Sequence, residues 1–275
     1  MNVKLIALDL DGTTLNSQNQ LTEKTKEALI KAAHLGIVVV PVTGRCYKSL
    51  PQELLELDGG NCIRYAVVSN GAEIRDAQSG EILYKNYIDP LGAEEIKNIL
   101  QKEALMIEIY VKGSAHIERS YYEKLEQGQI SYRSRDYVLT TRVPVRGVIH
   151  LLDVHKTQIE KVAVYFEPDS LQSKIKEALA DVKHAHITSS AKNNVELIAE
   201  NCSKARTLEK LCENLGIDLN EVMAAGDSQN DLEMLAAADI AVAMENADEN
   251  VKARADFVAA SNDCDGLAQA IMKFI

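Results

Sequence analysis

The chain lacks several features that would point to whole classes of protein. Its 275 residues include no tryptophan, three phenylalanines and five prolines, and no apolar stretch approaches membrane-spanning length. The five cysteines lie far apart and form no C-x-x-C pair, the usual zinc or redox motif. The short apolar run that leads into Asp9 does not resemble a secretion signal. We therefore expect a cytoplasmic protein with reduced cysteines and no membrane partner.

Positive charge is also scarce. Thirty lysines and arginines stand against 41 aspartates and glutamates, a formal net charge of -11. Nucleic acid is an unlikely partner for such a surface, because binding it requires a cationic face. Phosphorylated metabolites are repelled too, so a site for them needs a local cation, a metal ion or a helix N-terminus. We expect a globular monomer or weak homo-oligomer of one or two domains.

Three short apolar runs in the first third of the chain predict strands buried on both faces. Val3–Leu8, Ile37–Val42 and Ala66–Val68 each end abruptly in small or polar residues, as parallel strands do. Between the first two, residues 22–35 predict a helix that Thr22 caps and Gly36 ends.

Similar runs return near the end of the chain, at residues 222–225, 240–244 and 257–260. The fold class is therefore α/β, with a Rossmann-like, doubly wound parallel sheet as the core. We assign this core to residues 1–82 and 188–275.

The middle of the chain, residues 83–187, has a different pattern. Ile107, Ile109 and Val111 alternate with polar neighbours, and residues 162–166 alternate in the same way. Such alternation predicts an antiparallel sheet with one wet face. Helical patterns at residues 93–102 and 170–179 predict helices over its other face. We expect an inserted α/β domain.

The residues that follow the apolar runs are candidates for chemistry, since ligands of open α/β sheets bind beyond the carboxyl ends of the strands. These residues are Asp9, Thr43, Asn70 and Asp227. Two carboxylates, a hydroxyl and an amide suit a hard cation together with a phosphate. Asp9 and Asp11 stand two apart, so one can attack phosphorus while the other transfers protons. An ordinary Asp-Gly turn is the structural alternative.

Two further residues extend this constellation. Lys204 follows the predicted N-cap Ser203, in a first helical turn where the macrodipole disfavours a cation by about 0.3–1 kcal/mol. A bound phosphoryl group would compensate, although a solvated surface lysine is the alternative. Asp231 lies one helical turn after Asp227, where an acid can also serve as a helix cap. Opposed acids at strand ends need a cation, and Mg²⁺ would serve.

Four ordered motifs resemble those of the haloacid dehalogenase-like (HAD) superfamily, over nearly the whole chain. They are Asp9-Leu10-Asp11-Gly12-Thr13-Thr14-Leu15, Val42-Thr43-Gly44-Arg45, Ser203-Lys204 and Gly226-Asp227-Ser228-Gln229-Asn230-Asp231. Two more segments and the long insert resemble its Cof-type phosphatases; the segments are Ser69-Asn70-Gly71-Ala72 and Ala243-Met244-Glu245-Asn246-Ala247.

The resemblance implies a Mg²⁺-dependent phosphatase with a cap domain over the site, acting on small phosphorylated metabolites such as sugar phosphates or pyridoxal phosphate. It assigns Asp9 as nucleophile, which would form an aspartyl-phosphate, and Asp11 as acid/base. The residues implied for phosphate or substrate are Thr43, Gly44, Arg45, Asn70, Gly71, Lys204 and Asn230. Those implied for the metal are Asp9, the Asp11 carbonyl, Asp227 and, in support, Asp231.

Other readings remain open. A phosphotransferase or phosphomutase would pass the phosphoryl group to a second sugar hydroxyl, and a metabolite-binding sensor would keep the fold without catalysis. A nucleotide-cofactor oxidoreductase is disfavoured, because no G-x-G-x-x-G turn follows the first strand. We expect the cap to open and close about hinges near Leu83 and Ser189.

Overall fold

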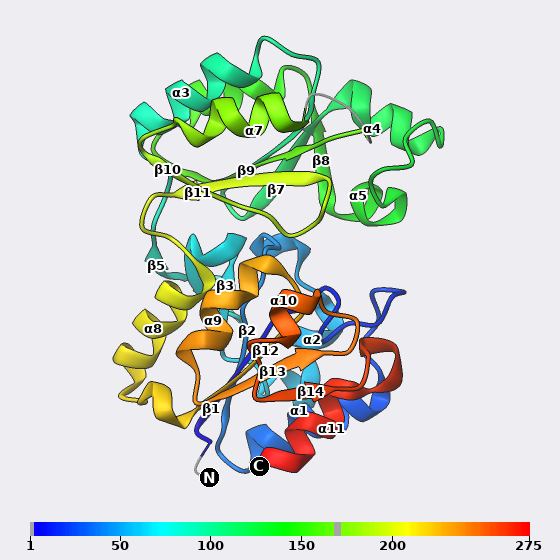
Figure 1. Cartoon of the computed structure of the whole chain (residues 1–275), viewed down its shortest axis with the longest axis vertical. Coiled ribbons are helices and arrows are strands. Elements are labelled where there is room, and N and C mark those ends of the chain that lie inside the picture. The colour runs from blue at the N-terminus through cyan, green and yellow to red at the C-terminus, as the bar shows by residue number, and fades with distance from the viewer. Residues whose placement is uncertain (1–2, 168–171) are drawn as a thin grey trace. The chain divides into compact units, whose positions relative to one another are not determined.

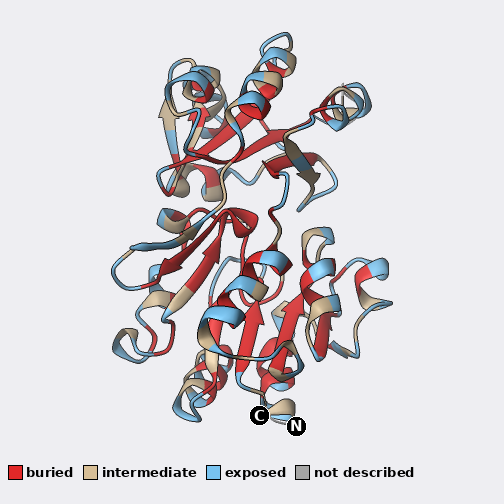
Figure 2. Cartoon of the chain, turned by 90° about the vertical axis from the view of Figure 1, so that its left-hand side faces the viewer, coloured by how far each residue is buried: buried red, intermediate tan, exposed pale blue. Residues whose placement is uncertain are grey.

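The computed structural model describes residues 3–167 and 172–275, which form two compact units. The first unit comprises residues 1–45, 50–85 and 203–275, and the second comprises residues 46–49 and 86–202. Most strands in the two units, though not all, are buried along much of their length (Figure 2). Among the described residues, no helix is long and apolar enough to cross a membrane.

A five-stranded, all-parallel sheet forms the centre of the first unit, in the order β14-β13-β12-β1-β2 (Figure 1). Its strands are β1 (Leu5–Leu8), β2 (Val38–Pro41), β12 (Val222–Gly226), β13 (Ile240–Met244) and β14 (Phe257–Ala259). Every residue of β1 is buried, as expected of a central strand covered on both faces. The predicted parallel core is thereby confirmed.

Helices cover both faces of this sheet. They are α1 (Glu23–His34), α2 (Gln52–Leu55), α8 (Lys204–Leu215), α9 (Leu232–Ala237), α10 (Glu249–Lys252) and α11 (Gly266–Phe274). Helices α8 and α9 pack together on one side, and α1 packs with α11 on the other (Figure 1). The Thr22 hydroxyl accepts a hydrogen bond from the Thr25 amide, so the predicted cap of α1 is confirmed.

The third apolar run joins a different sheet from the one expected. Strands β3 (Tyr65–Val68), β4 (Glu73–Asp76) and β5 (Ile82–Lys85) form a separate antiparallel sheet. Among the described residues, β3 meets the strand-two region at the isolated parallel bridge Val42–Val67, and a second bridge joins Val39 to Ile63, just before β3. The predicted buried strand at residues 66–68 is present, but its continuous ladder is antiparallel and its parallel pairing is limited to the bridge at Val67. A tight turn directly after Val68 reverses the chain into β4, which takes up the ladder.

A six-stranded sheet in the order β10-β11-β9-β6-β7-β8 forms the second unit. Its strands are β6 (Met106–Val111), β7 (Ser114–Glu118), β8 (Arg142–Val145), β9 (Ile159–Tyr165), β10 (Ala185–Thr188) and β11 (Asn194–Ala199). All neighbours pair antiparallel except β7 and β8. The predicted antiparallel sheet is confirmed, with one parallel pair added.

The helices of the second unit are α3 (Pro90–Leu100), α4 (Arg119–Glu126), α5 (Arg135–Thr141), α6 (Leu151–Val154) and α7 (Gln172–Ala180). Helices α3 and α7 correspond to the two predicted ones, although residues 170 and 171 lie outside the described residues. The unit extends to Cys202, beyond the expected boundary at residue 187, because β11 pairs with β9 and β10.

The predicted wet face of this sheet is absent from the described strands β6, β9 and β11, all of whose residues are buried. Glu108 accepts a hydrogen bond from Arg142 Nε at 2.8 Å, and Lys161 Nζ lies 2.7 Å from Glu196. Leu125 of α4 and Val138 of α5 pack in one apolar cluster with residues of this face. The alternating polar residues are thus paired with one another, and the prediction of a solvated face was wrong.

Candidate active site

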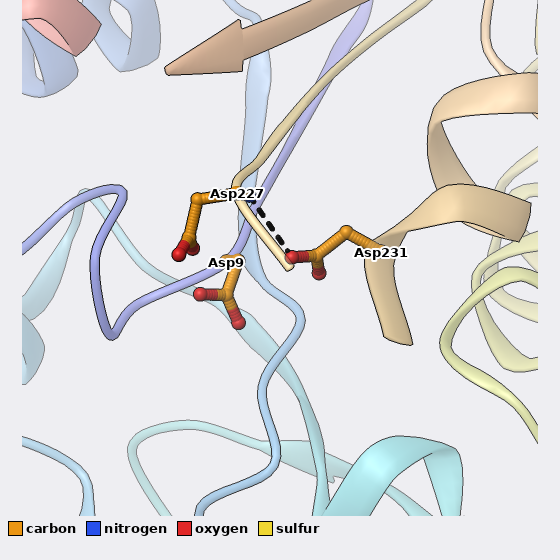
Figure 3. A group of neighbouring side chains, drawn as sticks. All are labelled: Asp9, Asp227 and Asp231. Atoms are coloured by element: carbon orange, nitrogen blue, oxygen red, sulfur yellow. Dashed lines mark hydrogen bonds between the residues drawn. The ribbon is translucent and has the colours of Figure 1, made fainter. Parts of the chain in front are cut away.

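Acidic residues from two strand ends meet at the carboxyl edge of the parallel sheet. Asp9 follows β1, Asp227 follows β12, and Asp231 lies at the start of α9 (Figure 3). One carboxylate oxygen from each lies within 4.8 Å of the others. Because β1 and β12 are neighbours in register, their ends deliver Asp9 and Asp227 to the same place. The structure therefore brings together three of the predicted metal residues.

Asp231 is oriented by the turn that joins β12 to α9. Its Oδ2 accepts hydrogen bonds from the amides of Asp227 at 3.1 Å and Ser228 at 3.0 Å (Figure 3). Its Oδ1 faces Lys204 instead. One carboxylate oxygen of Asp231 thus caps the turn, as the alternative prediction had it, and the other contacts Lys204.

Lys204 is the cation at the centre of this group. Its Nζ lies 2.5 Å from Asp9 Oδ1 and 2.6 Å from Asp231 Oδ1, and only 1% of its side chain is exposed. It occupies the first position of α8, whose N-cap Ser203 accepts a hydrogen bond from the Arg206 amide. The predicted helix start is confirmed, and the alternative of a solvated surface lysine is excluded.

Burial controls the electrostatics of the cluster. It raises the pKa of Asp9 well above its usual range against the opposing effect of Lys204, and Asp231 and Asp227 raise it further. Burial and the nearby Asp231 raise the pKa of Asp227 to about 7. Burial would lower the pKa of Lys204, but Asp231 and Asp9 raise it. These shifts disfavour the ionised carboxyl groups, because three carboxylates would carry more negative charge than one ammonium balances.

A divalent cation fits this imbalance. When ionised, three carboxylates and one ammonium leave two negative charges uncompensated in a buried place. Carboxylate oxygens are the ligands that Mg²⁺ prefers. The residues present therefore fit a Mg²⁺ ion, which Asp9 and Asp227 would bind directly, with Asp231 in support.

Asp11 is paired with Arg45 and is not one of the three clustered carboxylates. The guanidinium contacts both carboxylate oxygens, at 2.9 Å through Nε and 2.5 Å through Nη2, and Nη2 also donates to Asn19 Oδ1. Arg45 is buried, whereas 51% of the Asp11 side chain is exposed. This two-point contact fixes the plane of the Asp11 carboxylate. Sequence reasoning linked Arg45 to the phosphate and missed this pair.

The loop after β2 presents Thr43, Gly44 and Arg45. Thr43 is fully buried, and its amide donates to the Val67 carbonyl at 2.9 Å. Gly44 lies within a turn that brings the Arg45 amide to Thr43 Oγ1 at 3.2 Å. The loop is therefore tied to the segment that leads to Asn70.

Asn70, Gly71 and Asn230 come together from separate parts of the chain. Asn230 Nδ2 donates to Asn70 Oδ1 at 3.1 Å, and Thr207 Oγ1 donates to the Gly71 carbonyl at 2.7 Å. Gly71 has φ +98°, and a Cβ there would lie 2.4 Å from the Ser203 carbonyl oxygen. Gly71 thus packs against the start of α8 and supports Lys204.

The turn after β1 contains contacts that sequence reasoning did not assign. Thr13 Oγ1 donates to Asp227 Oδ1 at 3.0 Å, and Thr14 Oγ1 donates to the Asp9 carbonyl at 2.5 Å. A Cβ on Gly12 would lie 2.5 Å from Asp227 Oδ2. The two consecutive hydroxyls after Gly12 were the available signal, but the partner of Thr13 lies 214 residues away, and only that of Thr14 is local.

Comparison with known proteins agrees with this geometry. Residues 6–271 match the haloacid dehalogenase-like hydrolase family. Phosphatase YwpJ of Bacillus subtilis is 32% identical over 97% of this chain and 98% of its own length. The 5-amino-6-(5-phospho-D-ribitylamino)uracil phosphatase YcsE of the same organism is 28% identical over 100% and 97%.

A solved structure of a haloacid dehalogenase-like hydrolase from B. subtilis has a TM-score of 0.82 and 28% identity, over 99% of this chain and 100% of its own. The chain belongs to the haloacid dehalogenase-like hydrolases. Within that family it is a phosphatase, that is, a phosphoric monoester hydrolase.

Proposed function

We propose that the chain hydrolyses small phosphorylated metabolites in a Mg²⁺-dependent reaction in which Asp9 attacks phosphorus. The observation that carries this proposal is the buried contact of Lys204 with both Asp9 and Asp231, beside a third carboxylate from Asp227. Such a cluster is costly to bury unless an anionic ligand and a cation complete it.

Asp9 is the proposed nucleophile because it alone of the two motif acids lies against Lys204. A carboxylate oxygen of Asp9 forms a bond to phosphorus as the bond from phosphorus to the ester oxygen breaks, which leaves an aspartyl-phosphate. Lys204 then offsets charge on the phosphoryl oxygens, and Thr43 and Asn230 donate hydrogen bonds to them.

Asp11 is the proposed acid and base. Its carboxyl group gives a proton to the departing alkoxide, and later takes one from the water that attacks the aspartyl-phosphate. Arg45 holds this group by two hydrogen bonds. The contact fixes the position of the carboxyl group from which both proton transfers would take place.

Mg²⁺ would be held by the carboxylates of Asp9 and Asp227 and by the Asp11 carbonyl, with Asp231 in support. When bound it supplies positive charge for the phosphoryl oxygens. Without it, burial and mutual repulsion raise the pKa values of Asp9 and Asp227, which weakens the nucleophile.

The proposed substrates are sugar phosphates or monoesters like pyridoxal phosphate. The relative YcsE is named for a substrate with a phosphate on a ribityl chain, which belongs to this class. We further propose that the inserted region is a cap that selects the substrate and closes over it. The hinges expected near Leu83 and Ser189 fall inside β5 and inside the second unit, so we place them instead at the unit boundaries, residues 85–86 and 202–203.

Phosphate release decides between this proposal and its alternatives. We expect a sugar-phosphate panel and p-nitrophenyl phosphate to yield inorganic phosphate with Mg²⁺ but not with EDTA. Asp9→Asn should abolish release, whereas Asp136→Asn, at an exposed residue of α5, should leave it intact. A phosphorylated second sugar in place of free phosphate would instead indicate a phosphotransferase or phosphomutase.

Two results would contradict the proposal itself. Release that survives Asp9→Asn would mean that another group is the nucleophile. Folded protein that binds Mg²⁺ and a sugar phosphate but releases nothing would indicate a sensor.

A further inference from the structure

A cavity of about 330 Å³ lies within the second unit, apart from the residues of the candidate active site. Helix α4 contributes to its lining, as do the segment between α4 and α5 and the end of β9. The lining residues that matter below are Tyr121, Lys124, Tyr132, Tyr165, Phe166 and Glu167. Its volume is at the lower end of the range for small-molecule sites, which run from about 300 to 1,000 Å³. Such a cavity holds one small ring system.

Three tyrosines, Tyr121, Tyr132 and Tyr165, contribute to the lining and pack in one cluster. Tyr165 is buried, and the Arg133 guanidinium lies 4.2 Å from the centroid of its ring, which helps to fix that ring. The Phe166 side chain packs instead in the apolar cluster of α3 and α7. Tyr121 and Tyr132 are half-buried. Rings fixed at a cavity wall favour a flat aromatic ligand, because stacking gives contact at little cost in conformational entropy.

Two hydroxyl groups provide polar contacts. Within residues 3–167 and 172–275, the side-chain hydroxyls of Tyr121 and Tyr132 have no recorded hydrogen-bond partner, and no fully buried side-chain polar atom lacks one. Both hydroxyls must therefore reach solvent. Burial, with Glu167 nearby, raises the pKa of Tyr121, and it raises the pKa of Tyr132 to about 12. At neutral pH both are hydrogen-bond donors.

The charges at the cavity favour a neutral ligand. Lys124 and Glu167 are both exposed lining residues and carry opposite charges. Lys124 Nζ also lies 5.3 Å from the centroid of the Tyr121 ring, which satisfies part of its attraction for an aromatic face. A charged ligand would gain from one of these side chains and lose to the other.

We propose that this cavity is a second ligand site, for an uncharged nitrogen heterocycle of nucleobase size. The ring stacks on the tyrosine side chains, and its nitrogen or carbonyl acceptors take hydrogen bonds from Tyr121 and Tyr132. The site belongs wholly to the second unit and does not depend on the phosphatase chemistry.

Titration calorimetry with adenosine and uridine tests the proposal, because neither nucleoside carries a phosphate for the active site. We expect saturable binding of at least one of them, and none of ribose, which lacks the ring. Tyrosine ring signals in NMR spectra should shift on binding, and the absence of tryptophan leaves ten tyrosines as the main aromatic reporters.

Three conservative variants locate the binding. Tyr121→Phe and Tyr132→Phe keep the ring and remove one donor each, and should weaken binding about fivefold. Tyr122→Phe is the matched control on α4, because the Tyr122 hydroxyl donates to the Leu139 carbonyl and does not line the cavity. It should leave the affinity unchanged.

Two outcomes would overturn the proposal. One is the absence of saturable heat with either nucleoside up to roughly 10 mM, a limit that corresponds to negligible affinity. The other is binding that Tyr121→Phe and Tyr132→Phe leave at the wild-type affinity, since the ligand would then lie elsewhere.

Discussion

Lys204 illustrates how a single residue can be unfavourable locally and favourable in its tertiary setting. The first turn of α8 presents the positive end of the helix dipole, which opposes a cation. Contacts with Asp9 and Asp231 outweigh that opposition. Removal of the ammonium would leave these carboxylates buried without their partner.

We predict that Lys204→Met lowers the free energy of unfolding by about 3 kcal/mol in EDTA, because a buried ion pair loses one partner. Urea unfolding measures the loss. Lys210→Met, on the same helix but in an exposed pair with Glu213, should leave the free energy of unfolding nearly unchanged. Equal losses in the two variants would show that Lys204 is not a buried partner.

Gly71 supports a second prediction. Gly71→Ala should destabilise by about 3 kcal/mol, because it combines a positive φ with a steric clash against the Ser203 carbonyl. Gly216→Ala, at the other end of α8, meets open space at φ +67° and should cost about 1 kcal/mol. Thermal unfolding of the two variants compares them. A milder effect at Gly71 would mean that the start of α8 moves easily.

For single residues, the sequence predicts the place in a strand or helix better than it predicts the contact partner. Asp9 and Lys204 could be placed at a strand end and a helix start, because local hydrophobic runs and caps determine both. The contact of Arg45 with Asp11 could not be predicted, since the two lie 34 residues apart and only the folded loop brings them together.

Strand β6 shows the corresponding limit for a whole element. Its alternation of apolar and polar residues correctly predicted an antiparallel strand, but Glu108 is buried beside Arg142 and Arg133. A buried strand face lined by paired charges cannot be told from a solvent-exposed face in the sequence, because both place polar residues at every second position. Strand β3 likewise had the expected type but a different main partner.

Glu108 gives a pH prediction. Burial would raise its pKa, but Arg133 and Arg142 lower it from 4.5 to about 2. A carboxyl group with a lowered folded pKa stabilises the fold above its unfolded pKa, and this stability is lost as pH falls toward the folded value. We expect a loss of about 3 kcal/mol between roughly pH 5 and pH 2.

Urea unfolding across that pH range provides the measurement. Glu108→Gln should be less stable at pH 7 and should lose this part of the pH dependence. Glu123→Gln, at an exposed residue of α4, should retain the wild-type profile. The prediction fails if Glu108→Gln and wild type lose stability in parallel as pH falls.

The whole molecule has a net charge of -11, so any added salt can stabilise it by screening the repulsion between its acidic groups. A test of Mg²⁺ binding must separate the effect of the bound ion from this screening. We predict that Mg²⁺ at a hundredfold its Kd stabilises the protein by about 2.7 kcal/mol, because the ion binds only the folded carboxylate cluster. Thermal unfolding with Mg²⁺, EDTA or Na⁺ at matched ionic strength tests this. Asp227→Asn should abolish the Mg²⁺ effect, and an equal effect of Na⁺ would contradict site binding.

The order of segments along the chain also has a consequence for protein synthesis. Strand β1 pairs with β12 in register from Leu5 with Val222, so the first strand leaves the ribosome long before one of its neighbours exists. The edge of β1 that pairs with β12 stays unpaired until about two hundred more residues have been synthesised. Such long-range pairing is slow. Asp9 meets Lys204 and Asp227 only near the end of translation. A nascent chain therefore carries its proposed nucleophile early but cannot assemble this site until most of the chain has been made.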